Sequence, residues 1–305
     1  MIDPKPKAVL YLTEADVLQA LTMPVAIERL RAAFADWRAG LAGNQVRRRM
    51  LLPSGCLLHS MAGWHGKYFA TKVYSTHPKY GAWFFVHLFD AETGRPLAIL
   101  EANHLGQIRT GAASGLATDL LANPDARTVA ILGSGFQARS QVEAIRTVRP
   151  SVQNVLVWSR SEERRTRFAT EVGGIACPTA ELAVRNAEIV CTATYSRQPI
   201  LDVAWLAPGT HINAIGSNHP DRREIPGELV HRADMIVADS IEACAVEAGD
   251  LILADVDWNQ VVELRFVERS WRPQAITLFK SVGLGLEDSV AAAYVYEHYT
   301  GSRAS

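Results

Sequence analysis

The chain has 305 residues, a formal net charge of −1 at pH 7, and 48% hydrophobic and 21% charged residues. This composition is typical of a globular protein of one large or two ordinary domains. The balanced charge excludes the basic surface that nucleic-acid binding needs, and no apolar run approaches the ~18 residues that span a bilayer.

The N-terminus and the cysteines indicate the cellular compartment. Met1–Val9 contains two lysines and two prolines but no apolar stretch, so it does not form a secretion signal. The four cysteines are far apart in sequence, form no Cys-x-x-Cys pair and have no histidine at metal-ligand spacing. We therefore expect a cytoplasmic protein with neither a disulfide framework nor a metal site.

Two helices and a small sheet are predicted first along the chain. Thr13 followed by Asp16 is typical of a helix N-cap, and a second helix with Pro24 in its first turn ends at Gly40. Five short strands separated by turn residues follow and predict an antiparallel meander. Their expected ranges are Val46–Leu52, Cys56–Ala62, Tyr68–Tyr74, Trp83–Phe89 and Pro96–Leu100. The Ala-, Gly- and Ser-rich stretch Thr110–Leu121 then predicts a closely packed helix.

Strands and helices alternate in the second half of the chain. Short apolar runs suited to a buried parallel sheet occur at Thr128–Leu132, Val155–Trp158, Ile189–Thr194, His211–Ile215 and Met235–Ala238. Helical stretches such as Ala138–Val148 and Glu162–Glu171 lie between them, which predicts right-handed crossovers. The fold class is therefore α/β, with a Rossmann-type doubly wound domain over residues 118–286. Residues 1–117 and 287–305 form a smaller α+β domain, which includes all but the first residue of the Ala-rich helix Leu286–Tyr299.

A glycine-rich turn joins the first strand of the Rossmann-type half to its helix. Gly133-Ser134-Gly135-Phe136-Gln137-Ala138 fits G-x-G-x-x-G/A. The first glycine allows the tight turn, the second lets the backbone approach a pyrophosphate, and the small last residue lets the helix pack on the strand. The motif alone also suits a structural turn. Its position between a strand and a helix, with the next strand at Val155, favours dinucleotide binding.

The end of the second strand bears on the choice of coenzyme. NAD-selective sites usually have Asp or Glu there to bind the ribose 2′-hydroxyl, whereas this chain has Ser159 and Arg160. A carboxylate would repel the 2′-phosphate of NADPH, and Ser and Arg would bind it. We therefore expect NADP(H) to be favoured. If Arg160 only covers the adenine or faces solvent, NAD(H) is usable as well.

Three basic groups precede the Rossmann-type half. The first is Arg47-Arg48-Arg49, in which alternation along a strand puts Arg47 and Arg49 on one face and Arg48 on the other.

The other two basic groups are Lys72, in an apolar strand, and Arg109. Burying an unpaired ammonium would be costly, so Lys72 needs a charged partner or a ligand. Two arginines and a lysine would suit a small carboxylate, because the guanidinium fork binds it at two points. The alternative is salt bridging, for instance to Glu92 or Glu101.

The motifs taken together resemble the ornithine cyclodeaminase/mu-crystallin family. The matching segments follow the family's order over almost the entire chain. They are Thr71-Lys72-Val73, Gln107 to Ala113, Ile131 to Ala138, Gly216 to Pro220, Arg223-Glu224, Val237 to Ser240 and Phe279 to Gly283. The resemblance implies a homodimer whose smaller domain binds the substrate and mediates dimerisation.

The resemblance also implies roles for individual residues. Carried over by position, the residues that would bind the substrate carboxylate and polarise its reacting centre are Arg47, Lys72 and Arg109. Because of the triple-arginine run, the alignment can place either Arg47 or Arg49 at the first of these positions, and this choice stays open. The implied coenzyme contacts are Thr110, Gly133, Ser134, Gly135, Phe136, Gln137, Ser159, Arg160, Thr192, Ala193, Thr194, Gly216, Ser281, Val282 and Gly283.

One departure from the family pattern bears on the reaction. Ornithine cyclodeaminases have an aspartate that acts as a base near the substrate nitrogen, and this chain has Asn218 there. An amide cannot accept the proton that must leave an amine before hydride is removed, whereas a protonated imine needs no such base. Asn218 therefore favours imine reduction, in which it would orient the nitrogen. His219 is either a proton donor or acceptor or a surface turn residue.

The leading hypothesis is an NAD(P)H-dependent ketimine reductase that acts without a metal on Δ1-pyrroline-2-carboxylate, Δ1-piperideine-2-carboxylate or an acyclic imino acid. Two alternatives stay open. One is amino-acid oxidation or deamination of the ornithine cyclodeaminase or alanine dehydrogenase type, and the other is an NAD(P)H-dependent binding protein of mu-crystallin type. Several aromatic residues either line a pocket for the substrate side chain or pack the sheet. They are Trp64, His65, Tyr80, Trp83 and His87.

Overall fold

The computed structural model describes residues 8–301. The segment Met1–Val9, which we predicted not to be a secretion signal, therefore lies outside the described residues except for Ala8 and Val9. The chain forms two compact units. Unit 1 comprises Met1–Arg109 and Leu284–Ser305, and unit 2 comprises Thr110–Gly283. The boundaries expected from the sequence, after residues 117 and 286, lie further along the chain in both places.

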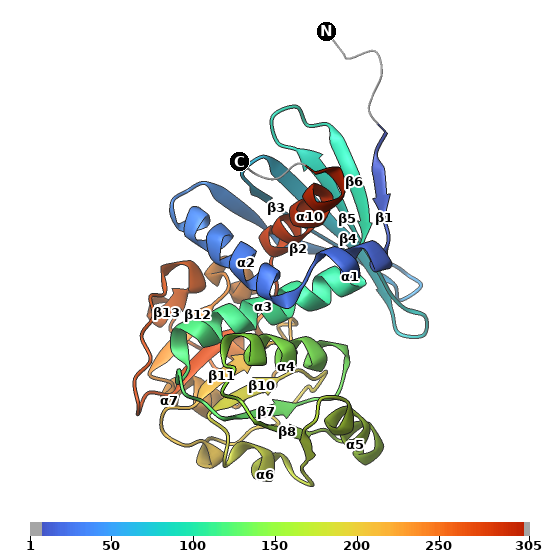
Figure 1. Ribbon diagram of the computed structural model, residues 1–305. Coiled ribbons are helices and arrows are strands. Elements are labelled where there is room, and N and C mark those ends of the chain that lie inside the picture. Colours follow the sequence, from blue (N-terminus) through green and yellow to red (C-terminus); the bar gives the residue numbers. More distant parts are fainter. Residues whose placement is uncertain (1–7, 302–305) are drawn as a thin grey trace. The chain divides into compact units, whose positions relative to one another are not determined.

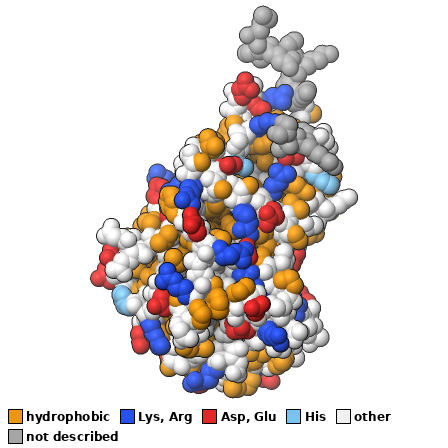
Figure 2. Space-filling model, turned by 60° about the vertical axis from the view of Figure 1, so that its left-hand side comes forward, with side chains coloured by type: hydrophobic (Ala, Val, Ile, Leu, Met, Phe, Trp, Pro, Cys, Tyr) orange, Lys and Arg blue, Asp and Glu red, His pale blue; other side chains and the backbone are white. Residues whose placement is uncertain are grey.

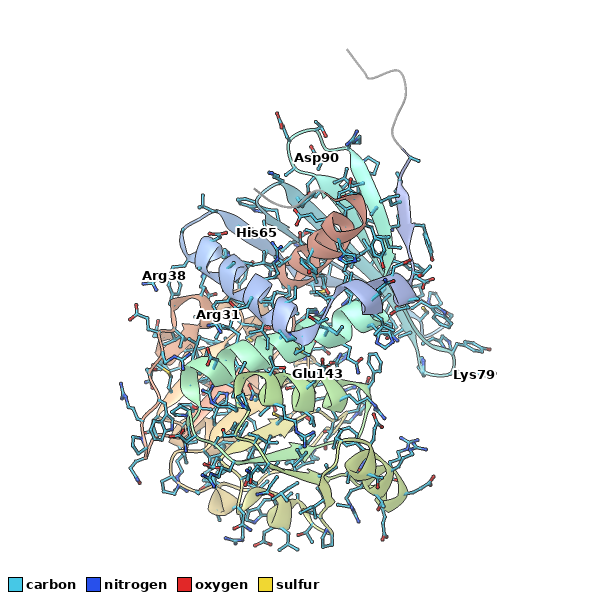
Figure 3. All side chains as sticks on the ribbon, viewed as in Figure 1. Arg31, Arg38, His65, Lys79, Asp90 and Glu143 are labelled. Carbon is cyan, nitrogen blue, oxygen red and sulfur yellow. The ribbon has the colours of Figure 1, made fainter. Side chains whose placement is uncertain are left out.

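Unit 1 is built on a six-stranded sheet (Figure 1). Its strands are β1 (Leu10–Leu12), β2 (Ala42–Leu51), β3 (Leu57–His65), β4 (Tyr68–His77), β5 (Gly81–Asp90) and β6 (Pro96–Glu101). They lie in the order β1-β6-β5-β4-β3-β2, with β2 to β6 antiparallel and β1 parallel to β6. The predicted meander is confirmed, and the short β1 is an addition to it. Lys79, labelled in Figure 3, lies at the tip of the β4–β5 hairpin.

Three helices of unit 1 pack on this sheet: α1 (Glu14–Ala20), α2 (Met23–Arg38) and α10 (Gly285–Thr300) (Figure 1). The Thr13 side chain accepts a hydrogen bond from the backbone N–H of the third residue of α1, which completes the predicted cap. Pro24 lies in the first turn of α2, where its missing N–H costs no helical hydrogen bond. The local signals for both helices are therefore confirmed.

Helix α10 lies against β3 in direct backbone contact. A Cβ on Gly63 would overlap the backbone of Leu286, and a Cβ on Gly285 would overlap the backbone of Ala62. Glycine at both positions therefore lets the helix settle onto the strand. As a result, every residue from Gly285 to Ala292 is buried, including two carboxylates.

The opposite face of the sheet carries aromatic side chains that stay partly exposed. Trp64 and Trp83 expose 42% and 54% of their surface, and Tyr80, in the β4–β5 turn, exposes 62%. Phe69 and Phe89 stack on each other with ring centroids 4.9 Å apart. Trp64 packs over Gly43 of β2, but about half of the surface of Trp64 and of Trp83 remains open to solvent.

Helix α3 (Asn103–Leu121) begins well before Thr110, so the predicted start was wrong. The Glu14 carboxylate accepts hydrogen bonds from the backbone N–H groups of Asn103 (2.6 Å) and His104 (2.9 Å). This cap comes from a side chain far away in sequence, so no local signal marks the start of the helix. Consequently Arg109 lies inside α3 and does not precede it.

Unit 2 contains a parallel sheet of eight strands (Figure 1). They are β7 (Thr128–Leu132), β8 (Asn154–Trp158), β9 (Ile175–Ala176), β10 (Ile189–Thr192), β11 (His211–Ala214), β12 (Met235–Ala238), β13 (Val261–Glu263) and β14 (Thr277–Lys280). The order is β13-β12-β14-β11-β10-β7-β8-β9, so the direction of winding reverses between β7 and β10. In such Rossmann-type sheets ligands bind at this reversal, beyond the carboxyl ends of the strands.

Short helices connect the strands of unit 2. They are α4 (Phe136–Val148), α5 (Glu162–Glu171), α6 (Ala180–Val184), α7 (Gly227–Arg232), α8 (Ile241–Glu247) and α9 (Gly249–Ile252), with 3₁₀ turns at Val203–Trp205, Trp258–Gln260 and Leu264–Phe266. A core of buried apolar side chains such as Ile131, Val157 and Phe168 packs α4 and α5 against the sheet. The predicted Rossmann-type α/β fold is confirmed, although three of its strands, β9, β13 and β14, were not predicted.

Two further features hold for residues 8–301. No helix there is long and apolar enough to cross a membrane, and no three His, Cys, Asp or Glu side chains gather in a group that could hold a metal ion. On the face shown in Figure 2, Lys and Arg side chains are interspersed with Asp and Glu, so neither sign of charge dominates that surface.

Candidate active site

The glycine-rich turn follows the carboxyl end of β7. Gly133 has a φ of +129°, and a Cβ there would overlap the carbonyl of Ala193 at the end of β10. Gly135 has an ordinary extended φ of −86°, and a Cβ there would meet nothing within 4 Å. The first glycine therefore closes the turn, and the second borders open space at the start of α4. This geometry fits a pyrophosphate that approaches the backbone.

The end of β8 is tied to this turn by hydroxyl groups. Ser134 Oγ donates to Ser159 Oγ at 2.9 Å, and Ser159 Oγ donates to the carbonyl of Ser161 at 3.2 Å. Arg165 Nη1 donates to the Ser159 carbonyl at 3.0 Å, while the neighbouring Arg160 is exposed. The backbone is thus fixed where a coenzyme ribose would lie, and the Arg160 side chain extends into solvent.

The Glu224 carboxylate joins the ends of β10 and β11. It is fully buried and accepts from Thr192 Oγ1 (2.8 Å), the Thr194 N–H (2.6 Å), Thr194 Oγ1 (2.7 Å) and the Gly216 N–H (2.7 Å). Three of the predicted coenzyme-contact residues are therefore held by one side chain, which makes Glu224 a positioning residue for both loops.

A buried ion pair fixes the segment that follows β11. Lys280 Nζ donates to Asp250 Oδ2 at 2.7 Å and to the carbonyl of Ser217 at 2.6 Å. Burial lowers the pKa of Lys280, but the Asp250 carboxylate outweighs it and the net shift is upward. Burial and Asp250 both raise the pKa of Glu224, whose backbone N–H donates to Asp250 Oδ1 at 2.6 Å.

Asn218 and His219 follow Ser217 on this fixed segment, and both are half-buried. The His219 carbonyl accepts from the Gly249 N–H at 3.2 Å and from the Arg222 N–H at 3.3 Å. These bonds hold the turn in place at the same sheet edge as the glycine-rich turn.

The Asp239 carboxylate organises the segment after β14. Its Oδ2 accepts from Ser281 Oγ (2.9 Å) and from the backbone N–H groups of Val282 and Gly283 (both 2.8 Å). Gly283 has a φ of +80°, which glycine adopts without strain. The predicted coenzyme-contact residues that follow strands of unit 2 therefore lie at the carboxyl edge of its sheet, and Thr110 is buried in α3.

Unit 1 contains a buried cluster of charged side chains. Asp288 Oδ1 accepts from Lys72 Nζ and from Arg109 Nε, each at 3.0 Å, and Glu287 Oε2 accepts from Arg109 Nη1 at 2.9 Å. The four residues come from β4, α3 and the start of α10, and each exposes at most 6% of its surface. Burial lowers the pKa of Arg109, but Asp288 and Glu287 outweigh it, so the pKa rises and the guanidinium stays charged.

The surroundings of Lys72 lower the pKa of its ammonium group. Its Nζ lies 5.7 Å from the centre of the Tyr74 ring and 5.5 Å from that of Phe84. A Cβ on Gly106 would lie only 3.0 Å from Nζ, so this glycine leaves room for the ammonium. Burial is the main cause that lowers the pKa of Lys72 to about 8; Asp288 opposes it, and the charges of Arg109 and Arg47 add to it.

The arginine run on β2 alternates as expected: Arg47 is buried, Arg48 is exposed and Arg49 is half-buried. Burial and the electrostatic effect on Lys72 both favour Arg47 over Arg49 as the member of the cluster. Lys72 and Arg109 do form salt bridges, as the alternative interpretation expected, but their partners are the carboxylates of α10 and not Glu92 or Glu101.

The sequence pattern of the ornithine cyclodeaminase/mu-crystallin family matches residues 7–303. The chain belongs to this family.

Three relatives illustrate the range of the family. Mouse ketimine reductase mu-crystallin is 39% identical over 221 residues, which cover 72% of this chain and 70% of the relative. The Thermococcus litoralis Δ1-pyrroline-2-carboxylate reductase, solved with NADH and L-proline, superposes with a TM-score of 0.90 at 30% identity over 96% of this chain and 98% of that one. An archaeal alanine dehydrogenase dimer with bound NAD superposes with a TM-score of 0.89 at 28% identity over 97% and 98% of the two chains.

Several charged residues of this family member escaped the sequence reasoning. Glu287 and Asp288 were missed, although two adjacent carboxylates in an otherwise Ala-rich apolar helix are a signal that cations must lie nearby. The anchoring roles of Glu224, Asp239 and Lys280 were missed as well. Most of their partners are backbone groups, which leave no trace in the pattern of side chains.

Proposed function

We propose that this family member is an NAD(P)H-dependent reductase of imino acids that acts on a small cyclic ketimine such as Δ1-pyrroline-2-carboxylate. The buried cluster of Lys72 and Arg109 carries this proposal, because buried cations in a ligand site suit an anionic group. Relatives that are a ketimine reductase and a Δ1-pyrroline-2-carboxylate reductase support the same reaction class.

In the proposed mechanism unit 1 binds the substrate and unit 2 binds the coenzyme. Arg109, which the carboxylates of α10 engage through Nε and Nη1, would bind the substrate carboxylate together with Arg47. Lys72, held by Asp288, would place its positive charge beside the reacting carbon–nitrogen bond. Positioning and fixed charge would supply most of the rate enhancement.

The coenzyme would lie on the turn from Gly133 to Ala138, where, when bound, it supplies hydride to the imine carbon. The segments held by Glu224 and Asp239 would form the walls of its site. Asn218 would orient the protonated imine nitrogen through its amide oxygen, a task that needs no titrating group. His219, next to Asn218 in sequence, is a candidate to exchange a proton with the product nitrogen.

A coenzyme-consumption screen tests the proposed function. Purified protein with NADPH or NADH is supplied with Δ1-pyrroline-2-carboxylate, Δ1-piperideine-2-carboxylate, and keto acids mixed with methylamine or ammonia. We expect the highest kcat/KM for a cyclic ketimine. Formation of ammonia from ornithine with catalytic NAD, or tight substrate binding without any turnover, would refute the proposal in favour of a deaminase or a binding protein.

We further propose that NADPH is the preferred coenzyme, because Ser159 and the exposed Arg160 stand where an acidic residue would repel a 2′-phosphate. We expect a higher kcat/KM with NADPH than with NADH. Arg160→Asp should lower the NADPH/NADH ratio of kcat/KM at least about 10-fold, the effect of replacing a charge-assisted hydrogen bond by repulsion. The control Arg167→Asp, an exposed arginine of α5, should leave the ratio unchanged. A wild-type preference for NADH would contradict this prediction.

The assembly proposed for the chain is a homodimer that covers the aromatic face of the unit 1 sheet. Partly exposed side chains such as Trp64 and Trp83 on one face are typical of a protein interface. Light scattering should give a dimer for the wild type and a monomer for Trp83→Glu. The control Leu182→Glu, at a 51% exposed leucine of α6 in unit 2, should remain dimeric. A wild-type monomer at micromolar concentration would rule out this assembly.

A further inference from the structure

Asn218 lies in an irregular segment that is bonded to the buried core of unit 2. We call residues 216–222, which form neither helix nor strand, the Asn218 segment. The carbonyl of Ser217, directly before Asn218, accepts from Lys280 Nζ at 2.6 Å. The same Nζ donates to Asp250 Oδ2 at 2.7 Å, and both of these charged side chains expose 0% of their surface. The residue before Asn218 is therefore held by a fully buried ion pair.

Helix α9 holds the residue after Asn218. The His219 carbonyl accepts from the backbone N–H of Gly249, the first residue of α9, at 3.2 Å. A Cβ on Gly249 would overlap the carbonyls of His219 and Arg222, so the backbone of α9 lies directly on the Asn218 segment. Asp250 is the next residue of α9. The ion pair therefore links the end of β14 to the helix that holds the other side of the segment.

We propose that Lys280 is a positioning residue for the reduction, because it fixes the backbone of Ser217 and thereby the place of the Asn218 amide. This inference rests on the proposed function, in which Asn218 orients the imine nitrogen. Stability alone does not explain the buried pair, since replacing such a pair by apolar residues is often neutral or stabilising. A charged donor does give a hydrogen bond about twice as strong as a neutral one, which opposes displacement of the segment.

Asp250 has a second task that can be separated from its bond to Lys280. Its Oδ1 accepts from the backbone N–H groups of Glu224 (2.6 Å) and Ile225 (3.2 Å). An asparagine at position 250 can keep these bonds through its amide oxygen. The Glu224 carboxylate can then still bind the ends of β10 and β11 when the ion pair is removed.

The double variant Lys280→Met/Asp250→Asn tests the inference, because it removes both charges together and leaves no unpaired ion in the core. Methionine fills the volume of the lysine stem but donates no hydrogen bond to Ser217. We expect kcat for the ketimine to fall roughly 10- to 100-fold, the effect of a misplaced catalytic group. The Kd of the coenzyme from fluorescence titration should change less than about 3-fold, because the turn at Gly133 and the Glu224 bonds remain.

A cycle with Asn218→Ala separates positioning from general damage to the site. Because Lys280 acts through Asn218, Lys280→Met/Asp250→Asn should lower kcat less than about 3-fold when Asn218 is already alanine. Losses of kcat that multiply in the combined variant would overturn the inference. The control Arg265→Met/Glu263→Gln neutralises an ion pair at the edge strand β13 and should retain the wild-type kcat.

Hydrogen exchange of the wild type decides the inference even if the double variant does not fold. With saturating coenzyme, backbone amides of the Asn218 segment should exchange at least about 10-fold more slowly, after correction for intrinsic rates, than those of residues 195–198. That stretch is also irregular, and it begins with Tyr195, which exposes 90% of its surface. Equal exchange of the two stretches would mean that the Asn218 segment is not held.

The outcomes for the inference and for the proposed function are distinguishable. If no imine is reduced, the proposed function fails, and exchange of the Asn218 segment in the wild type and in the double variant still shows whether Lys280 holds it. If an imine is reduced and Lys280→Met/Asp250→Asn keeps the wild-type kcat, the inference fails and the reaction class stands.

Discussion

Lys72→Met should lower kcat/KM for the ketimine by roughly 100- to 1,000-fold, the cost of removing one preorganised charge from a reacting centre. Methionine has a similar length and no charge, so it can fill the space beside Tyr74 and Phe84 that the lysine stem occupies. Steady-state kinetics with purified variant and wild type would measure the effect. The control Lys67→Met, at an exposed lysine in the turn between β3 and β4, should retain wild-type activity.

The pH profile separates a catalytic role of Lys72 from a structural one. Its pKa of about 8 means that the group is an ammonium below that pH and a neutral amine above it. Activity that depends on the ammonium therefore falls as the pH rises through about 8, and the residual activity of Lys72→Met should lack that fall. Undiminished activity of Lys72→Met would remove Lys72 from the mechanism.

The parts of the fold that depend on local signals could be predicted from the sequence. The cap at Thr13, the proline of α2 and the strand–turn–helix around Gly133 each involve residues within a few positions of one another. The start of α3 could not be predicted, because its cap, Glu14, is 89 residues away from Asn103. Strand β14 was missed because its apolar run is interrupted by a lysine at its end, yet it is an interior strand of the sheet.

In the candidate site, the sequence indicates that a buried charge needs a partner but does not indicate which residue that partner is. The apolar strand around Lys72 indicates that the ammonium needs a partner, and this expectation is confirmed. The identity of the partner, Asp288, depends on a contact 216 residues away along the chain, which no spacing rule reveals. Asp288 is reachable only because glycines at positions such as Gly63 bring α10 into contact with the sheet.

The two glycines of the dinucleotide turn have different surroundings and therefore different expected effects. At Gly133 both the φ of +129° and the Ala193 carbonyl oppose a side chain, while Gly135 has neither constraint. A non-glycine residue in such a backbone region costs about 1–3 kcal/mol before any overlap is counted. Replacement of Gly135 by alanine at a helix N-cap costs only some tenths of a kcal/mol up to about one.

We therefore expect Gly133→Ala to lower the melting temperature by at least about 5 °C and to abolish coenzyme binding, because the turn and the end of β10 must move apart. Gly135→Ala should fold like the wild type but raise the Kd of NADPH at least about 10-fold, since its methyl group would occupy the space that the pyrophosphate needs. Thermal unfolding with and without NADPH, together with fluorescence titration of the coenzyme, would measure both effects. If Gly135→Ala bound NADPH as tightly as the wild type, the coenzyme would not lie on this turn, and the division of labour between the two units would have to be abandoned.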